Sequence, residues 1–326
     1  MSTPAEPRLS VANSGRPRWP WLFVFKVAIS AILLAWIISR ASFAEILAAV
    51  WSASIPLLLA AYALTFTGIV LSVSRWRLLL EAQGATLPTR WLLRSYLVAT
   101  FFNNFLPSTV GGDASRAYDC YRMTGGSRRA MSSVLLDRLL GLLALLLLAL
   151  GSLHFARPVS EHLPTLPVWL SLAVVGLMGV MGAILFGLPS RRLAPVMALV
   201  PRPLYRGIML VAGAFDLYRG QWRTLIVAFA LSFVLQFNVV AYFMLIALAL
   251  GLGVPALDFC LIVPLVSFVV VLPISINGIG LRENALAVMP GYYGVATADA
   301  VALAWLVYLG STIFALVGGV IYASRR

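Results

Sequence analysis

The sequence predicts an all-α polytopic membrane protein with six full transmembrane helices and two re-entrant helical hairpins in an inverted repeat. Three observations support this prediction. The chain of 326 residues is 61% hydrophobic and only 11% charged, whereas soluble domains carry about 25% charged residues. Several apolar runs reach the roughly 20 residues that cross a bilayer. Two similar segments, both broken by proline and glycine, lie about half a chain length apart.

Six apolar runs are long enough to be full spans. The first run follows a polar N-terminus that contains proline and arginine, so we expect residues 1–19 to form a disordered cytoplasmic tail. This run is too long for a signal-peptide core, which predicts an uncleaved first span. The six predicted spans are Trp21–Ser39, Ile55–Val73, Val134–His154, Val168–Leu188, Leu225–Leu250 and Val301–Tyr322.

The two broken segments are Leu106–Arg116 (LPSTVGGDASR) and Leu272–Arg282 (LPISINGIGLR), which share Leu, Pro, Gly and Arg at aligned positions. Such a pair in corresponding places of two halves is typical of transporters built from a repeat, and the broken backbone must line an enclosed cavity. We therefore predict two membrane repeat halves of opposite orientation, 20–160 and 161–326. The expected gate and hinge residues are Pro107, Gly111, Gly112, Pro273, Gly278 and Gly280.

The arginines orient the predicted spans, because cytoplasmic loops carry an excess of basic residues. Trp91–Leu106 has arginines on both flanks, which predicts a hairpin that enters from the cytoplasm and returns to it. Phe259–Leu272 and the helix after it predict a second hairpin from the opposite side. Arg75 and Arg77 are expected on the cytoplasmic flank of the second span. The chain is thus predicted to be a multi-pass protein of the cell inner (cytoplasmic) membrane with both termini in the cytoplasm.

Three stretches carry a family resemblance: FFNNFLPSTVGGDASRAYDCYRMTG, SSVLLDRLLGLLALL and LPISINGIGLRENAL. Together they resemble the flippase-like transmembrane domain of the lysylphosphatidylglycerol synthases and its stand-alone relatives, over roughly Trp21 to Tyr322. The resemblance implies translocation of phospholipids or polyprenyl-linked lipids. In the synthases a soluble catalytic domain follows, whereas this sequence ends at Arg326, so aminoacyl transfer is not expected here.

Polar residues within the apolar runs are the candidate site, because such residues are costly in hydrocarbon and face the bundle interior. Asp113 and Arg116 lie one helical turn apart. Either the two residues form a phosphate site at a helix start, or Asp113 caps the helix and Arg116 pairs with it. Asn103 and Asn104 either satisfy carbonyls freed by Pro107 or contact a headgroup.

The remaining candidates flank the later breaks. Asp137 and Arg138 either line a cavity or form an ion pair between their span and a re-entrant helix. Arg282 and Glu283 diverge by about 100° on a helix, so they cannot face one partner. Arg282 is predicted as the outer phosphate clamp or as an interfacial anchor. The full candidate set for headgroup binding or translocation is Asn103, Asn104, Asp113, Arg116, Asp137, Arg138, Asn277, Arg282 and Glu283.

Three functions fit these residues. The first is a translocator that moves an anionic phospholipid or a polyprenyl-phosphate-linked lipid between leaflets. The second is a membrane-embedded enzyme that modifies lipid headgroups, and the third is a non-transporting accessory subunit of a lipid or glycan assembly enzyme. No catalytic constellation or metal-ligand spacing is visible, and Cys120 and Cys260 lie far apart, so no catalytic residue, metal or cofactor is predicted.

The net charge of +13 arises from arginines scattered over membrane-flanking loops, which excludes a nucleic-acid partner. Membrane lipids with an anionic headgroup or a polyprenyl phosphate are the expected partners. A separate lipid-modifying enzyme and a second copy of the chain are the other partners that we consider. No Walker-type phosphate loop is present, so any transport is expected to be facilitated diffusion or ion-coupled.

Overall fold

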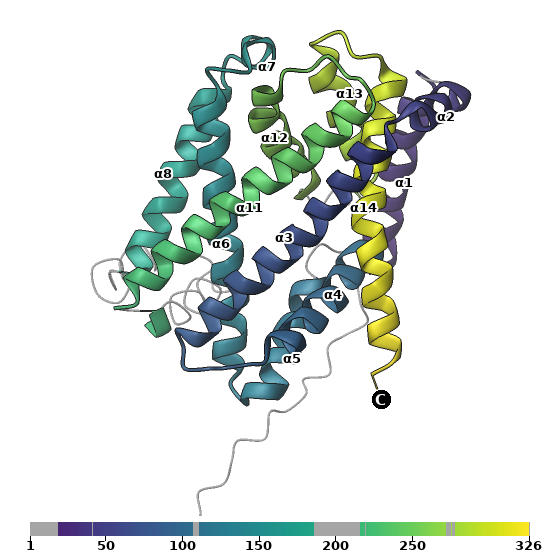
Figure 1. The fold of residues 1–326 in the computed structure, drawn as a ribbon. Coiled ribbons are helices and arrows are strands. Elements are labelled where there is room, and N and C mark those ends of the chain that lie inside the picture. Colours follow the sequence, from purple (N-terminus) through teal and green to yellow (C-terminus); the bar gives the residue numbers. More distant parts are fainter. Residues whose placement is uncertain are drawn as a thin grey trace, which may run out of the picture.

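The computed structural model describes residues 19–40, 42–106, 111–185, 216–218, 220–271, 275 and 278–325. These ranges contain helices and no strand (Figure 1). Residues 1–18 of the predicted tail, the basic stretch 191–206 and Arg326 lie outside the described residues, whereas Trp19 begins the first helix. The α-helices are α1 (Trp19–Ile38), α2 (Phe43–Ser52), α3 (Ile55–Glu81), α4 (Thr89–Phe105), α5 (Gly111–Thr124), α6 (Ser127–Ser152), α7 (Arg157–His162), α8 (Leu166–Leu185), α11 (Trp222–Ala249), α12 (Phe259–Val271), α13 (Leu281–Gly291) and α14 (Thr297–Ala323).

Four of the described helices, α3, α6, α11 and α14, are long and apolar enough to cross a membrane. At about 1.5 Å per residue, each extends roughly 40 Å, which exceeds the hydrocarbon core of about 30 Å. The 20-residue helices α1 and α8 lie at the first and fourth predicted spans. The chain is therefore a multi-pass membrane protein, whereas the count of six spans stays a prediction.

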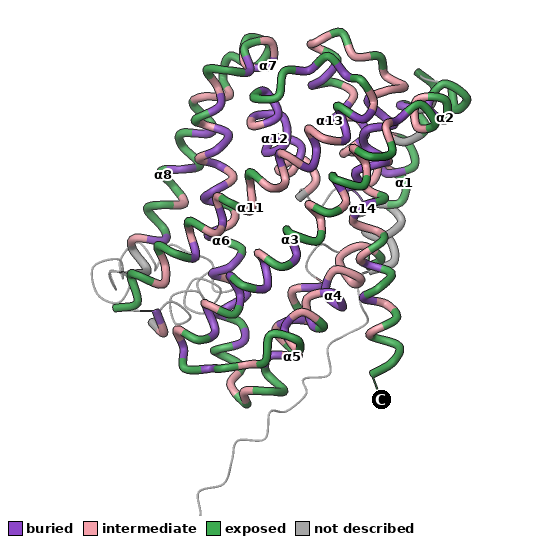
Figure 2. Tube along the Cα trace, in the orientation of Figure 1, coloured by how far each residue is buried: buried purple, intermediate pink, exposed green. Residues whose placement is uncertain are grey.

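The long helices α3 and α11 pack against each other and leave much of their apolar surface exposed or only partly buried (Figure 2). Only 22% of the apolar stretch of α3 and 17% of that of α11 is buried. Exposed side chains on these helices include Phe66 and Phe237. Soluble proteins rarely expose apolar surface of this extent, so we assign these faces to lipid contact.

Two broken helix pairs lie at opposite ends of the bundle. The pair α4–α5 occupies the lower part of Figure 1 and the pair α12–α13 the upper part. In the second half of α5, Asp119 forms an ion pair of 2.8 Å with Arg325, which follows the last turn of α14. Helix α13, in contrast, ends shortly before the first turn of α14. Just after that end, Tyr292 stacks on His162 of α7. The two pairs therefore approach the bundle centre from opposite ends.

The helix contacts also repeat between the two parts of the chain. Helix α4 packs against α14, and correspondingly α12 packs against α6. Helix α5 packs against α6, and α13 against α14. Helices α6 and α14, the last long helices of the two parts, therefore each contact both broken pairs.

Helix α3 differs from its predicted limits, because it continues past Val73 to Glu81. Arg75 and Arg77 thus lie within the helix, beyond the predicted end of the span, and their place on the cytoplasmic flank of the membrane stays a prediction. Buried residues recur at helical spacing up to this end, at Ser72, Trp76 and Leu79 among others. The helix thus continues as long as one face packs on its neighbours. The short helices α2 and α7 were not predicted.

Candidate functional site

A cluster of five charged side chains joins α3, α5 and α6. The carboxylate of Asp137 lies 2.6 Å from Nε of Arg75 and 3.3 Å from Nη2 of Arg116. Arg116 also contacts Asp113 at 3.0 Å, and the other oxygen of Asp113 lies 2.6 Å from Nε of Arg138. We call these five residues the ion-pair cluster. Two aspartates within it are shared among three arginines.

Most of the ion-pair cluster is buried, which explains why each carboxylate has two basic partners. Arg75, Arg116 and Asp137 are all buried, and a buried charge is costly unless it is paired and hydrogen-bonded. The guanidinium of Arg116 also lies 5.2 Å and 5.1 Å from the ring centres of Trp76 and Tyr96, within cation–π range. Arg116 is thus enclosed by two carboxylates and two rings. Its ion pair with Asp113, one of the two predicted alternatives, is present, whereas the capping role of Asp113 stays a prediction.

Arg138 differs from the rest of the cluster, because 48% of its side chain is exposed. It faces a cavity while it pairs with Asp113. Asp137 and Arg138 are neighbours on α6. Asp137 pairs with Arg116 of α5, and Arg138 pairs with Asp113 of the same helix. The predicted ion pair between this span and the broken helix is therefore present, and Arg138 lines the cavity as well.

Arg75 is the cluster member that sequence reasoning missed. Besides its ion pair with Asp137, it donates a 2.7 Å hydrogen bond from Nη1 to Ser232 of α11. Arg75 lies on the same helical face as the other buried residues of α3, and this spacing is the signal that the sequence offered. A positive-inside interpretation hides that signal, because it counts an arginine near a span end as a flanking charge.

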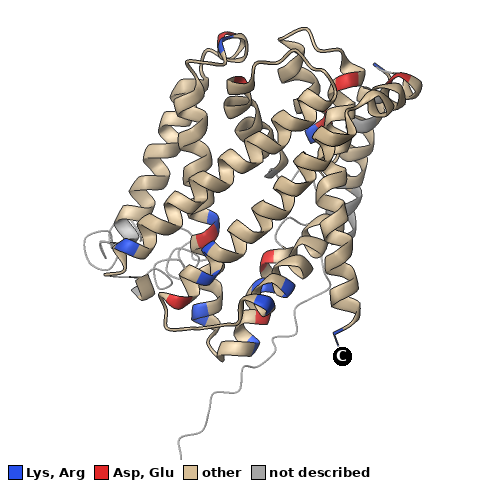
Figure 3. Ribbon diagram, in the orientation of Figure 1, with Lys and Arg blue, Asp and Glu red and all other residues tan. Residues whose placement is uncertain are grey.

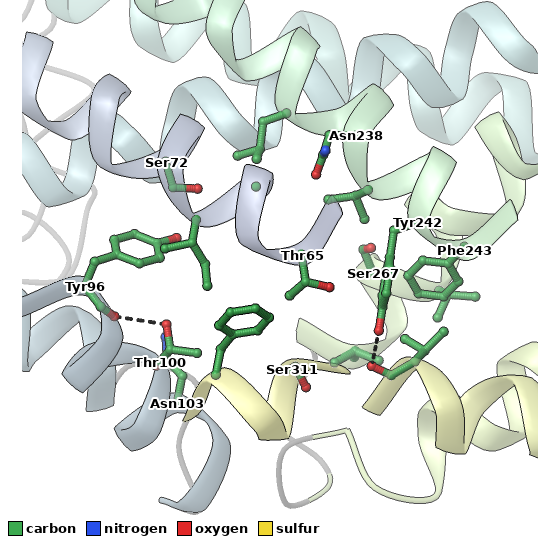
Figure 4. Close-up of a pocket in the computed structure, with 18 of the residues that line it drawn as sticks. Thr65, Ser72, Tyr96, Thr100, Asn103, Asn238, Tyr242, Phe243, Ser267 and Ser311 are labelled. Atoms are coloured by element: carbon green, nitrogen blue, oxygen red, sulfur yellow. Dashed lines mark hydrogen bonds between the residues drawn. The ribbon is translucent and has the colours of Figure 1, made fainter. Parts of the chain in front are cut away.

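A cavity with two adjoining lobes lies next to the cluster. The wide lobe has a volume of about 540 Å³ and the narrow lobe about 390 Å³. Figure 4 shows a pocket whose walls come from α3, α4, α11 and α14, among others, with polar and aromatic side chains around it. The narrow lobe contains all five residues of the ion-pair cluster. The lobes share the wall residues Ser72, Tyr96, Thr100, Asn103, Arg138, Leu235 and Ser267.

Arg282 lies in the wall of the wide lobe, at the start of α13. Its guanidinium lies 5.2 Å from the ring centre of Tyr308. Within the described part of the chain, no carboxylate forms an ion pair with it. The cluster around Arg116 thus has no counterpart around Arg282, although the two arginines occupy aligned positions of the broken segments.

Glu283 caps its own helix. Its Oε2 accepts a 2.7 Å hydrogen bond from the backbone N–H of Gly280, and its side chain is buried. This contact satisfies an N–H group at the helix start. Gly280 adopts φ +82°, a conformation that favours glycine. Glu283 is thus a structural residue held by its own helix start.

The two asparagines at the end of α4 have different partners. Oδ1 of Asn103 accepts a 2.9 Å hydrogen bond from the N–H of Gly112, so it satisfies a donor of α5. Nδ2 of Asn104 donates to the hydroxyl of Thr312 on α14 at 3.1 Å. Only Asn103 lines both lobes. Pro107, Pro273 and Asn277 lie outside the described residues.

The described glycines of the predicted gate fit tight local geometry. A side chain at Gly112 would overlap the carbonyl of Ala99 and the amide of Asn103, and one at Gly111 would contact Leu106. Gly278 has φ +73° and lies against Val270. The described residues contain no group of three or more His, Cys, Asp or Glu side chains that could hold a metal ion.

We compared the chain with models of protein families. The family model of the lysylphosphatidylglycerol synthase TM region matches residues 23–319. This match covers the described helices from α1 to most of α14, including the ion-pair cluster and both lobes of the cavity. A comparison with the curated proteins finds no match.

Proposed function

Because the chain belongs to the lysylphosphatidylglycerol synthase transmembrane family, which is named for the synthesis of a membrane lipid, we propose that it is a lipid translocator. The proposed substrate is an anionic phospholipid or a polyprenyl-phosphate-linked lipid that moves between leaflets. Its headgroup would pass through the two-lobed cavity while the acyl chains stay in the bilayer.

The observation that carries the proposal is the position of the cavity between the two broken helix pairs. Asn103 at the end of α4 and Arg282 at the start of α13 both line the wide lobe. These pairs approach from opposite ends of the bundle, so a headgroup in this lobe lies between two segments of interrupted helix. Transporter sites form at such interruptions near the bilayer centre.

We assign headgroup contact to Arg138 and Arg282 rather than to Arg116. A guanidinium binds phosphate through two parallel hydrogen bonds. Arg282 has no carboxylate partner within the described residues. Arg138 pairs with Asp113, but it lines both lobes and 48% of its side chain is exposed. Arg116 already contacts two carboxylates, so its proposed role is to hold α5 against α6.

The repeated helix contacts support an inverted repeat with alternating access. Each broken pair packs on long helices from both parts of the chain, so rocking of one part against the other would open one end of the cavity and close the other. Basic side chains gather at the end of the bundle that holds α4 and α5 (Figure 3). By the positive-inside rule we propose that this end faces the cytoplasm of an inner membrane.

Proteoliposomes that contain only the purified chain test the proposal. A fluorescent anionic phospholipid is incorporated in both leaflets, and a membrane-impermeant quencher is added outside. We expect the protein to raise the quenched fraction above the level of protein-free vesicles, and Arg282→Gln to reduce this effect strongly without loss of folded protein. Arg77→Gln is the matched control, because Arg77 lies outside both lobes.

Three other outcomes would contradict the proposal. A chemically altered headgroup would identify a membrane-embedded enzyme. Transport that requires a separate lipid-modifying enzyme would identify an accessory subunit. Normal transport by Arg282→Gln would show that this arginine is an anchor and not a phosphate ligand.

A further inference from the structure

Helix α14 contacts both broken helix pairs, one with each of its halves. In the first half, Val301 and Ala302 belong to a buried cluster against which Ala287 of α13 packs. In the second half, Gly318 lies directly on the backbone of Leu97 of α4. The middle of α14 therefore lies between the segment that holds one pair and the segment that holds the other.

In this middle, two tyrosines of neighbouring helices donate hydrogen bonds to backbone carbonyls of α14. The hydroxyl of Tyr62 on α3 donates to the carbonyl of Leu306 at 3.4 Å. The hydroxyl of Tyr242 on α11 donates to the next carbonyl, that of Val307, at 2.7 Å (Figure 4). A helix carbonyl already accepts from the N–H group four residues later, so each of these two has a second donor.

The third carbonyl in the row has donors from its own helix. Tyr308 accepts from the hydroxyls of Ser311 and Thr312 at 2.8 Å and 2.9 Å, and hydroxyls bonded back to the preceding turn often bend helices. Gly310, in the same turn, is a weak helix former, and a side chain there would overlap the hydroxyl of Tyr242. Sharp kinks of helices occur at such Gly/Ser pairs, so this turn combines two features of a bend.

The side-chain donors lower the cost of opening the helix within a membrane. A helix that bends loses backbone hydrogen bonds, and an unpaired carbonyl in hydrocarbon is costly. Neighbouring helices and Ser or Thr hydroxyls satisfy such freed groups. At residues 306–308 these donors are already bonded to the carbonyls, so a bend leaves none of the three carbonyls without a partner.

We propose that residues 306–312 form a hinge in α14, an inference that rests on the proposed alternating access and deepens it. The half of α14 that holds α13 turns about this segment relative to the half that holds α4. A rigid helix bound to both broken pairs would force them to move together, whereas alternating access requires one end of the cavity to open while the other closes. The two tyrosines keep the freed carbonyls paired during this motion.

Hydrogen exchange of the full chain in lipid nanodiscs tests the hinge without any transport measurement. Mass spectrometry compares the amides at 310–312 with those of the flanking turns, 302–305 and 315–318, after correction for intrinsic exchange rates. Local opening exposes the N–H groups of the hinge itself. We expect exchange at 310–312 to be at least about tenfold faster, which corresponds to about 1.4 kcal/mol. Equal protection along α14 would overturn the proposal.

Substitutions then assign the opening to the side-chain donors. Tyr62→Phe combined with Tyr242→Phe leaves the opened carbonyls without partners, so exchange at 310–312 should slow about fivefold or more. Ser311→Ala, which removes a back-bonded hydroxyl and raises helix propensity, should slow it as well and tests the hinge even if the tyrosine variant folds poorly.

Ser74→Ala is the matched control, because it removes a similar hydroxyl-to-carbonyl bond from α3, outside both lobes. It should leave exchange at 310–312 unchanged. Faster exchange in the tyrosine variant would overturn the proposal, since the two hydroxyls would then only tie α14 to its neighbours.

Transport by the same variants separates the two proposals. If lipid moves while α14 is uniformly protected, the translocator stands and the hinge is wrong. If the amides at 310–312 exchange fast and the variants slow them, but no lipid moves, the hinge stands and the translocator is wrong. Slower transport by the hinge variants and normal transport by Ser74→Ala would support both.

Discussion

The ion-pair cluster places Asp137 at the meeting point of three helices. Its two oxygens contact Arg75 of α3 and Arg116 of α5 while the residue itself belongs to α6. In a buried site, the loss of one partner leaves an uncompensated charge, and this costs more than the intact pair contributes. We therefore interpret this aspartate as a structural residue that also sets the charge of the cavity.

Asp137→Asn should destabilise the protein strongly. The change leaves Arg75 without a carboxylate and Arg116 with one, so we expect a loss of about 3–5 kcal/mol in unfolding free energy. Chemical unfolding in detergent measures this loss. Glu81→Gln is the control: it removes the exposed Arg77–Glu81 pair, in which the side chains are 49% and 36% exposed, and it should cost about 0.5 kcal/mol or less. Similar effects of the two changes would show that the cluster does not stabilise the bundle.

At the scale of the helices, the broken pair α4–α5 depends on a close approach of two backbones. The N–H of Gly112 at the start of α5 donates to Asn103 of α4, and the carbonyl of Ala99 lies directly over the glycine. A glycine is required because a side chain would occupy the space of that carbonyl. The same feature joins α14 to α4, where Gly318 lies on the backbone of Leu97.

Gly112→Ala should therefore separate α5 from α4. We expect a loss of about 1–3 kcal/mol from overpacking, together with reduced transport, because Asn103 and Arg138 would shift in the cavity wall. Gly151→Ala on α6 is the matched control, since nothing lies within 4 Å of an added side chain there. This control should leave stability unchanged or raise it by up to about 1 kcal/mol, through helix propensity. An equal response of both variants would contradict the close approach.

The helices themselves show where sequence patterns are informative. The described long helices lie where apolar runs predicted them, because about 20 consecutive apolar residues leave few alternatives to a span. The end of α3 was predicted too early, at Val73, because Arg75 and Arg77 were counted as the end of the apolar run. Its actual end at Glu81 depends on packing against α6 and α11, which hydropathy does not contain.

For the whole molecule, the arrangement of the two broken pairs predicts which loops share a side of the membrane. Arg128 lies at the start of α6, near the outer end of the pair α4–α5. Ser160 in α7 and Thr297 at the start of α14 lie near the outer end of the pair α12–α13. These two groups of residues should therefore be on opposite sides.

Single cysteines test this topology in a chain with Cys120→Ser and Cys260→Ser. An impermeant maleimide applied from outside the cell should label Ser160→Cys and Thr297→Cys but not Arg128→Cys, which should react only after the membrane is opened. Labelling of position 128 from outside would contradict both the re-entrant hairpins and the inverted repeat.

The sequence by itself determined the class of the protein and where its helices break. Composition, apolar runs and the Pro/Gly segments are local properties, and each acts through the backbone or through contact with lipid, so no knowledge of neighbours is needed. The same properties identified Asp113, Arg116, Asp137, Arg138 and Arg282 as unusual charges in apolar surroundings.

Only the tertiary structure decided what each charge contacts. Arg75 reaches Asp137 across 62 positions of sequence and Ser232 across 157, and no local pattern encodes such partners. The aligned arginines 116 and 282 look equivalent in sequence, yet one is enclosed by two carboxylates and the other faces a cavity beside Tyr308. Ion pairing depends on distance and burial in three dimensions, so the packing of the helices assigns the two arginines different environments.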